Sequence, residues 1–274
     1  MTLYPKVSLI AASAVTFLFC TFLTTQAQVT RTEAVQVKPP LIRMIDPPSA
    51  DATANDLESR GDELHGQKLY FDAIDYYRAA LLKSPAKGRI LNKICRTQLV
   101  MARWRDAQKS CEQAIKVDRT MGDPHNNLGV ALYEEGHFGA AVKQYHKAIA
   151  IDDTSASFYS NLGAALFSKK QFEPAVVAYQ KAMEIDPEVF DRTSRTGVQA
   201  QLPSPGDRAH YDYTVAKLYA KMGFSDRSLE YLKKAMEEGY KDFKNVYKDA
   251  EFAELRRDKR FVELMASKPA TLPD

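Results

Sequence analysis

The side chains with the greatest capacity for chemistry are five histidines, three cysteines and many carboxylates. The histidines are scattered along the chain, so we do not expect three of them to converge on a metal ion. The carboxylates follow no catalytic pattern, and the chain has neither a glycine-rich phosphate loop nor a nucleophile elbow. We therefore expect no metal, no cofactor and no catalysis. The histidines are His65, His125, His137, His146 and His210.

Charge and composition describe an ordinary globular protein. The 274 residues are 45% hydrophobic and 27% charged, which is enough apolar material for a sizeable core. The 38 Lys and Arg residues nearly balance the 35 Asp and Glu residues, leaving a net charge of +3. A protein that binds nucleic acid through phosphates is usually far more basic, so we expect no nucleic-acid partner.

The N-terminus has the pattern of an export signal. Lys6 precedes the uncharged residues 7–23, and a small residue, Ala27, ends a cleavage-like triplet. A cleaved signal peptide over residues 1–27 makes the mature chain periplasmic or secreted, without membrane insertion. An uncleaved anchor over residues 7–23 is the alternative, and it too leaves the remainder outside the cytoplasm. Cys20 follows Phe19 rather than a small residue, which disfavours lipidation.

Residues 28–53 are predicted to form a tether, because two Pro-Pro pairs favour extended chain. The alternative is that its apolar residues pack on the first helix or on a partner. These residues are Leu41, Ile42 and Met44.

A period of 34 residues then runs through the chain without a slip. Apolar residues within each period fall at helical spacing, in two stripes separated by a turn. A small residue recurs at Gly61, Cys95, Gly129 and Gly163. An alanine recurs at Ala73, Ala107, Ala141 and Ala175. A mostly aromatic position recurs at Tyr77, Cys111, Tyr145 and Tyr179. We expect two antiparallel helices per period, with close contact between Gly129 and Ala141 in the third.

The third period, NNLGVALYEEGHFGAAVKQYHKAIAIDD, and the fourth, SNLGAALFSKKQFEPAVVAYQKAMEIDP, resemble the tetratricopeptide repeat. The resemblance implies an all-α, right-handed superhelical solenoid of antiparallel helix hairpins. It covers four contiguous units over residues 54–189, namely 54–87, 88–121, 122–155 and 156–189. After a predicted loop at 190–208, residues 209–242 resemble a fifth unit. Residues 243–274 resemble the capping helices and tail of bacterial members, and the charged run 256–260 is expected to form the polar outer face.

The resemblance also implies a concave groove lined by the first helix of each unit. Family groove positions carried over to this chain fall on eleven residues. They are Asn92, Arg96, Leu99, Asn126, Asn127, Val130, Tyr133, Ser160, Asn161, Ala164 and Phe167. Asparagines in such a row can hydrogen-bond an extended peptide backbone, and Leu99, Tyr133 and Phe167 can form an apolar stripe. The same residue types also suit the scaffold alone.

Cys95 and Cys111 replace a glycine and an aromatic residue in the second unit. Export would place them where disulfides persist. If the small site faces Ala107, however, Cys95 lies one helical turn away from Cys111. A disulfide and two buried free thiols both remain open.

The function we predict is a non-catalytic scaffold or adaptor outside the cytoplasm, which holds a peptide or a helix of a protein partner in its concave groove. One alternative is a structural subunit of an envelope or secretion assembly that docks through the 190–208 loop and the cap. Another is an accessory protein of an envelope enzyme system.

Overall fold

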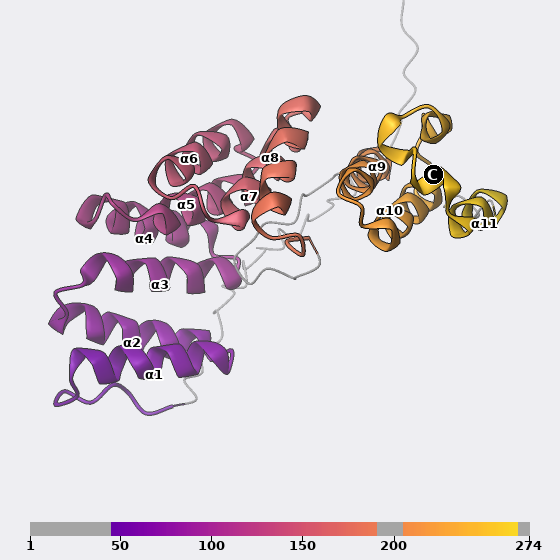
Figure 1. Cartoon of the computed structure of the whole chain (residues 1–274). Helices are drawn as coiled ribbons and strands as arrows, with labels where there is room; N and C mark the ends of the chain where they lie inside the picture. The colour runs from indigo at the N-terminus through magenta and orange to yellow at the C-terminus, as the bar shows by residue number, and fades with distance from the viewer. Residues whose placement is uncertain (1–44, 191–204, 268–274) are drawn as a thin grey trace, which may run out of the picture. The chain divides into compact units, whose positions relative to one another are not determined.

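The computed structural model describes residues 45–190 and 205–267, and every regular element in these two ranges is helical. The first range contains antiparallel helix hairpins (Figure 1). Their helices are α1 (Ala54–Gly66), α2 (Tyr70–Lys83), α3 (Lys87–Val100), α4 (Trp104–Val117), α5 (Gly122–Glu134), α6 (Phe138–Ile151), α7 (Ala156–Ser168) and α8 (Phe172–Ile185). The second helix of each hairpin starts 34 residues after the one before, so the predicted all-helical repeat is confirmed.

In the first, third and fourth hairpins, a glycine of the first helix lies against a tyrosine ring of the second helix. A Cβ atom on Gly61, Gly129 or Gly163 would lie 2.5 Å from a ring carbon of the tyrosine sixteen residues later. These tyrosines are Tyr77, Tyr145 and Tyr179, all buried. The close partner of Gly129 is therefore Tyr145, whereas the sequence had suggested Ala141.

The second hairpin replaces this glycine–tyrosine pair with two cysteines. Because the two positions face each other directly, the Cα atoms of Cys95 and Cys111 lie only 5.4 Å apart, and a disulfide joins them. The sequence left this disulfide open, because the small site was expected to lie opposite Ala107, one helical turn from Cys111. Both cysteines are fully buried in a small cluster with Ala107 and Leu128.

The turn inside each hairpin uses one left-handed residue, always the fifteenth of its unit. Gly136 (φ 80°) and Gly223 (φ 81°) suit that conformation because they lack a Cβ atom. The other units place Lys68 (φ 64°), Ala102 (φ 54°) and Lys170 (φ 60°) there. Those three turns carry backbone strain that the glycine turns do not.

The second range contains a further hairpin and a cap. Its elements are α9 (Pro205–Lys221), α10 (Ser225–Glu237), the 3₁₀ turns η1 (Phe243–Tyr247), η2 (Ala250–Phe252) and η3 (Leu255–Arg257), and α11 (Lys259–Ser267). Helix α9 starts four residues before the expected Ala209, so the end of the predicted 190–208 loop is helical. Asp207 in its first turn complements the positive end of the helix dipole.

The cap is tied together by part of the charged run 256–260. The Arg256 guanidinium is half-buried and donates to the carbonyls of Val246 and Asp249, each at 2.9 Å. Arg260 pairs with Asp226 and Asp258. Because these groups join the cap to itself and to α10, the run is more than the polar outer face predicted for it.

Of the predicted tether, only residues 45–53 are described, and they contact the first hairpin. Ile45 and Ala52 pack against the cluster formed by α1–α3. The Lys83 ammonium donates to the carbonyls of Ala50 and Ala52 at 2.5 and 2.6 Å. The predicted signal peptide, and Leu41, Ile42 and Met44, lie outside the described residues.

Candidate functional site

The first helices of neighbouring units are joined by a side-chain contact that recurs every 34 residues and links two residues 35 apart. It links the fifth residue of one unit to the sixth residue of the next. Between α1 and α3 it is an ion pair, Glu58 Oε1 to Lys93 Nζ at 2.6 Å. Between α3 and α5, and between α5 and α7, an amide donates to an amide. Asn127 Nδ2 donates to Asn92 Oδ1 at 2.9 Å, and Asn161 Nδ2 to Asn126 Oδ1 at 2.8 Å. We call this row of contacts the inter-repeat ladder.

The inter-repeat ladder changes the role of the predicted asparagines. Asn126, Asn127 and Asn161 are buried, and each uses an amide group to bond the neighbouring helix. Only Asn92 of this set is half-exposed. The row is therefore first a contact between repeats, which aligns α1, α3, α5 and α7 in a common register. The three buried asparagines do not present open amide groups to a peptide, as the sequence had suggested.

The predicted apolar stripe is likewise mostly core. Tyr133 lies 5.1 Å from the Phe138 ring and Phe167 lies 4.9 Å from Phe172, centroid to centroid. Each pair spans the turn of one hairpin and belongs to the largest hydrophobic cluster. Val130 and Ala164 are buried too, while Arg96, Leu99 and Ser160 remain half-exposed. Tyr133 and Phe167 also contact the following repeat, through Ser168 and through His210 and Tyr211, so these two rings pack within and between the hairpins.

In successive units a buried hydrogen-bond donor lies at the level of the ninth residue. In the first unit Tyr77 donates its hydroxyl to Asp62, the ninth residue, at 2.8 Å. Val130 and Ala164 occupy that position in the third and fourth units. The Tyr145 and Tyr179 hydroxyls are buried there without a hydrogen-bond partner among the described residues. Burial raises the pKa of both phenols, so they stay protonated donors.

In the second unit, Arg96 itself occupies the ninth position. Its Nε is buried, and no described residue accepts from it. Units two, three and four thus each hold one unpaired donor at the level of the ninth residue: Arg96 Nε, Tyr145 Oη and Tyr179 Oη. We call these three atoms the donor row.

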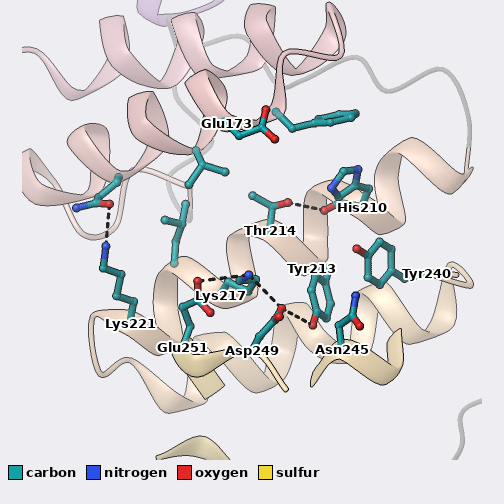
Figure 2. Close-up of a pocket in the computed structure, with 14 residues that line it drawn as sticks. Glu173, His210, Tyr213, Thr214, Lys217, Lys221, Tyr240, Asn245, Asp249 and Glu251 are labelled. Carbon is teal, nitrogen blue, oxygen red and sulfur yellow. Dashed lines mark hydrogen bonds and ion pairs between the residues drawn. The ribbon is translucent and has the colours of Figure 1, made fainter. Parts of the chain in front are cut away.

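A separate pocket of about 320 Å³ lies where α8, α9 and the cap meet (Figure 2). Its rings are in mutual contact: His210 lies 4.3 Å from Phe172, and Tyr240 stacks 4.4 Å from Tyr213, centroid to centroid. Glu173 extends into the space from the opposite wall, above Thr214 (Figure 2). Because α8 and α9 touch only sparingly, the side chains between them do not close the space.

Two networks set the charge of this pocket. Lys217 Nζ contacts Asp249 Oδ2 at 3.0 Å and Glu251 Oε1 at 3.3 Å, while Tyr213 donates to Asp249 at 2.9 Å. Lys221 donates to the Gln180 side chain at 3.2 Å. Burial lowers the pKa of His210, which favours the neutral imidazole.

A carboxyl with a shifted pKa lies on α9. Burial raises the pKa of Asp212 to about 7, and the Glu238 carboxylate adds to the rise, while Lys234 and Arg208 oppose it. Arg208 Nε lies 3.2 Å from Glu238 Oε1. Asp212 is 9% exposed and lines neither the donor row nor the pocket.

Within residues 45–190 and 205–267, no group of three or more His, Cys, Asp or Glu side chains is arranged to hold a metal ion. Over the same residues no helix has the length and apolarity needed to cross a membrane. The candidate anchor at 7–23 lies outside this part of the chain.

Two family models match the region where the repeats are most regular. A tetratricopeptide repeat model matches residues 156–189, and a second model of the repeat matches residues 131–170. Both fall on the hairpins whose helices, turns and inter-repeat ladder are described above. The chain is a tetratricopeptide-repeat (TPR) protein. Stacked tetratricopeptide repeats form extended surfaces that bind other proteins, so the chain is a protein-interaction scaffold.

Solved structures to which this chain is similar include MamA and two TPR proteins. MamA is 24% identical, with 67% of this chain and 96% of that chain covered and a TM-score of 0.46. TTC0263 of Thermus thermophilus is 17% identical, with 78% and 100% covered and a TM-score of 0.48. YrrB, described as a TPR protein with an unusual peptide-binding site, is 16% identical, with 78% and 91% covered and a TM-score of 0.46. No curated protein matches the chain.

Neither the donor row nor the pocket of this TPR protein was predicted from its sequence. The donor row follows from Tyr145 and Tyr179 only once Val130 and Ala164 are compared with Asp62 in register. The pocket residues of α9 would have been found by continuing the groove positions past the insertion into the fifth unit. The contribution of Tyr240 and the cap has no signal in the repeat pattern.

Proposed function

We propose that this TPR protein is a non-catalytic adaptor outside the cytoplasm, which binds an extended segment of a partner protein along α3, α5 and α7. The observation that supports this proposal is the donor row. Three consecutive units each bury a hydrogen-bond donor that no described residue satisfies. A buried polar group without a partner costs about 1–3 kcal/mol, so three of them at equivalent positions favour a ligand that supplies acceptors.

An extended peptide backbone has acceptors at a suitable spacing. Neighbouring packed helices lie about 8–10 Å apart, and an extended chain advances about 3.3 Å per residue. One repeat therefore corresponds to about three peptide residues. Every third backbone carbonyl of the bound segment would accept from Arg96, Tyr145 and Tyr179 in turn, once the side chains that cover the two tyrosines, 0% and 1% exposed, have moved aside. This contact reads the backbone, so it tolerates many partner sequences.

The inter-repeat ladder supports the same function by fixing the receptor. Because α1, α3, α5 and α7 are held in register by Glu58–Lys93 and the asparagine pairs, the spacing of the donors is set before the segment binds.

The test is a crosslinking pull-down from the native cell envelope with a Tyr145→Phe/Tyr179→Phe variant. This change removes two unpaired hydroxyls and no internal hydrogen bond, so the melting temperature should stay the same or rise. Capture of the partner should fall. The control is Tyr247→Phe, the same substitution at a 58% exposed residue of the cap. Equal capture by wild type and the double variant would refute binding over the donor row.

The proposed location outside the cytoplasm rests on the N-terminal pattern and is supported by the disulfide between Cys95 and Cys111. Stable disulfides are typical of oxidising compartments. The intact mass of protein purified from its native source tests the location, because a cleaved signal leaves a chain that starts at Gln28. A chain that retains residues 1–27 and is recovered from the cytoplasmic fraction would contradict it.

A structural subunit role is the second candidate, and the pocket built by α8, α9 and the cap favours it, because these elements offer a surface separate from the donor row. Sedimentation velocity distinguishes the two. A monomer favours the adaptor, and a defined oligomer that is lost on truncation of residues 243–274 favours the subunit.

A further inference from the structure

We propose that the pocket between α8, α9 and the cap binds an arginine side chain of a partner protein. The site is separate from the donor row, and no residue is shared between them. At about 320 Å³ the pocket is sized for one or two side chains rather than for a folded element. The argument rests on its unpaired carboxylate, its rings and its charge balance.

Glu173 is the carboxylate of the pocket that lacks a counter-charge. Asp249 already accepts from Tyr213 and Lys217, and Glu251 pairs with the same lysine. Glu173 makes no hydrogen bond or ion pair with any residue that the structure describes, and it points into the space (Figure 2). A ligand that fills the pocket must satisfy this carboxylate or pay for removing it from water.

The charge of the pocket selects a cation. Three carboxylates, Glu173, Asp249 and Glu251, face two ammonium groups, Lys217 and Lys221. His210 is neutral near pH 7 because burial lowers its pKa. An anionic ligand would meet the unpaired Glu173; of the two ammonium groups, Lys217 is already held by two carboxylates and Lys221 donates to the Gln180 side chain.

The rings of the pocket distinguish arginine from lysine. His210 and Tyr240 lie with their planes 27° apart and their centroids 5.7 Å apart, beside Phe172 and Tyr213. A planar guanidinium can stack on such ring faces while two of its N–H groups donate to one carboxylate, here that of Glu173. An ammonium is more strongly hydrated and has no plane to stack, so it gains less from these walls.

The experiment titrates the full, ¹⁵N-labelled chain with N-acetyl-arginine-methylamide and follows amide chemical shifts. The expected result is a saturable change confined to residues 172–180, 210–221 and 240–251. N-acetyl-lysine-methylamide should bind several-fold more weakly, and N-acetyl-glutamate-methylamide should cause no saturable change. Equal responses to the arginine and glutamate probes, equal responses to the arginine and lysine probes, or no saturable response to arginine would overturn the proposal.

Glu173→Gln is the decisive variant. Glu173 is exposed, and the glutamine amide keeps the shape of the side chain while it removes the charge. We expect about a tenfold loss of affinity for the arginine probe, as for the loss of a charge-assisted pair. The matched control is Glu263→Gln on α11, which does not line the pocket. The unperturbed amide spectrum of each variant verifies folding. Unchanged affinity in Glu173→Gln would overturn the proposal, and neither result bears on Tyr145→Phe/Tyr179→Phe, which tests the donor row.

Discussion

Replacing Asp212 by asparagine should stabilise the fifth hairpin at alkaline pH and leave it unchanged at acidic pH. Asp212 is 9% exposed on α9, and burial with the help of Glu238 raises its pKa from 3.8 to about 7. Folding therefore favours the protonated carboxyl. The stability that Asp212 contributes is complete below pH 4, falls as the pH rises from 4 to 7, and is lost above 7. Asparagine cannot ionise, so the variant escapes this loss.

The size of the effect follows from the shift. A difference of about three pKa units corresponds to about 4 kcal/mol, at about 1.4 kcal/mol per unit. This value is a ceiling, because Lys234 and Arg208 can move toward the ionised carboxylate and asparagine lacks the proton that Asp212 can donate. We expect about 2 kcal/mol between wild type and Asp212→Asn at pH 8.5, and less than about 0.5 kcal/mol at pH 4.5.

Hydrogen exchange is the suitable assay, because repeat proteins unfold by parts and a global transition would average over the hairpins. Exchange of amides in α9 and α10 is compared between variant and wild type at the same pH, which cancels the intrinsic pH dependence of exchange. Asp153→Asn, at an exposed residue of the third unit, is the control. Equal protection of wild type and Asp212→Asn at pH 8.5, or loss of protection in the variant at both pH values, would refute the reasoning.

Three further predictions concern the repeats, each checked by thermal or denaturant unfolding. Ala102→Gly should stabilise the protein by about 1 kcal/mol and Gly136→Ala should destabilise it by a similar amount, since both residues have a left-handed backbone conformation. If both variants changed stability in the same direction, the turn at Ala102 would not be strained. Gly129→Ala should cost about 1–3 kcal/mol, because the new Cβ would lie 2.5 Å from the Tyr145 ring, and a neutral result would place that ring elsewhere. Reduction of the Cys95–Cys111 disulfide should cost up to about 3 kcal/mol for its short loop, whereas alkylation of both thiols in protein isolated under oxidising conditions would show that the bond does not form.

Most of the fold could be read from the sequence because the repeat fixes it at many positions at once. The recurrence of small residues at Gly61, Gly129 and Gly163 and of rings at Tyr77, Tyr145 and Tyr179 was sufficient for helix hairpins. Which of these residues touch each other was less certain, because a helical stripe does not tell whether a small residue faces the alanine or the ring. That ambiguity led to the wrong neighbour for Gly129 and left the cysteines of the second unit undecided.

The candidate site was harder to predict because its residues serve two roles that look alike in sequence. An asparagine on a first helix can bond a peptide or the next helix. The hydrogen bond from Asn127 to Asn92, 35 residues earlier, shows that here it bonds the neighbouring helix. The pocket depends on how far α9 stands from α8, which the 34-residue period does not fix. Residues such as Glu173 and Tyr240 belong to no shared motif, so their meeting is visible only in three dimensions.

The inter-repeat ladder also governs how the number of repeats can change when a gene is rearranged. Precise loss of the third unit, residues 122–155, would bring Asn161 opposite Asn92 and restore the same amide pair. Loss of the second unit, residues 88–121, would bring Asn127 opposite Glu58, a 6% exposed carboxylate that would then lack both Lys93 and Arg89. The array is thus tolerant of duplication or deletion in its middle and intolerant of it near its start, so lineages that lengthen or shorten this scaffold should do so at the third unit.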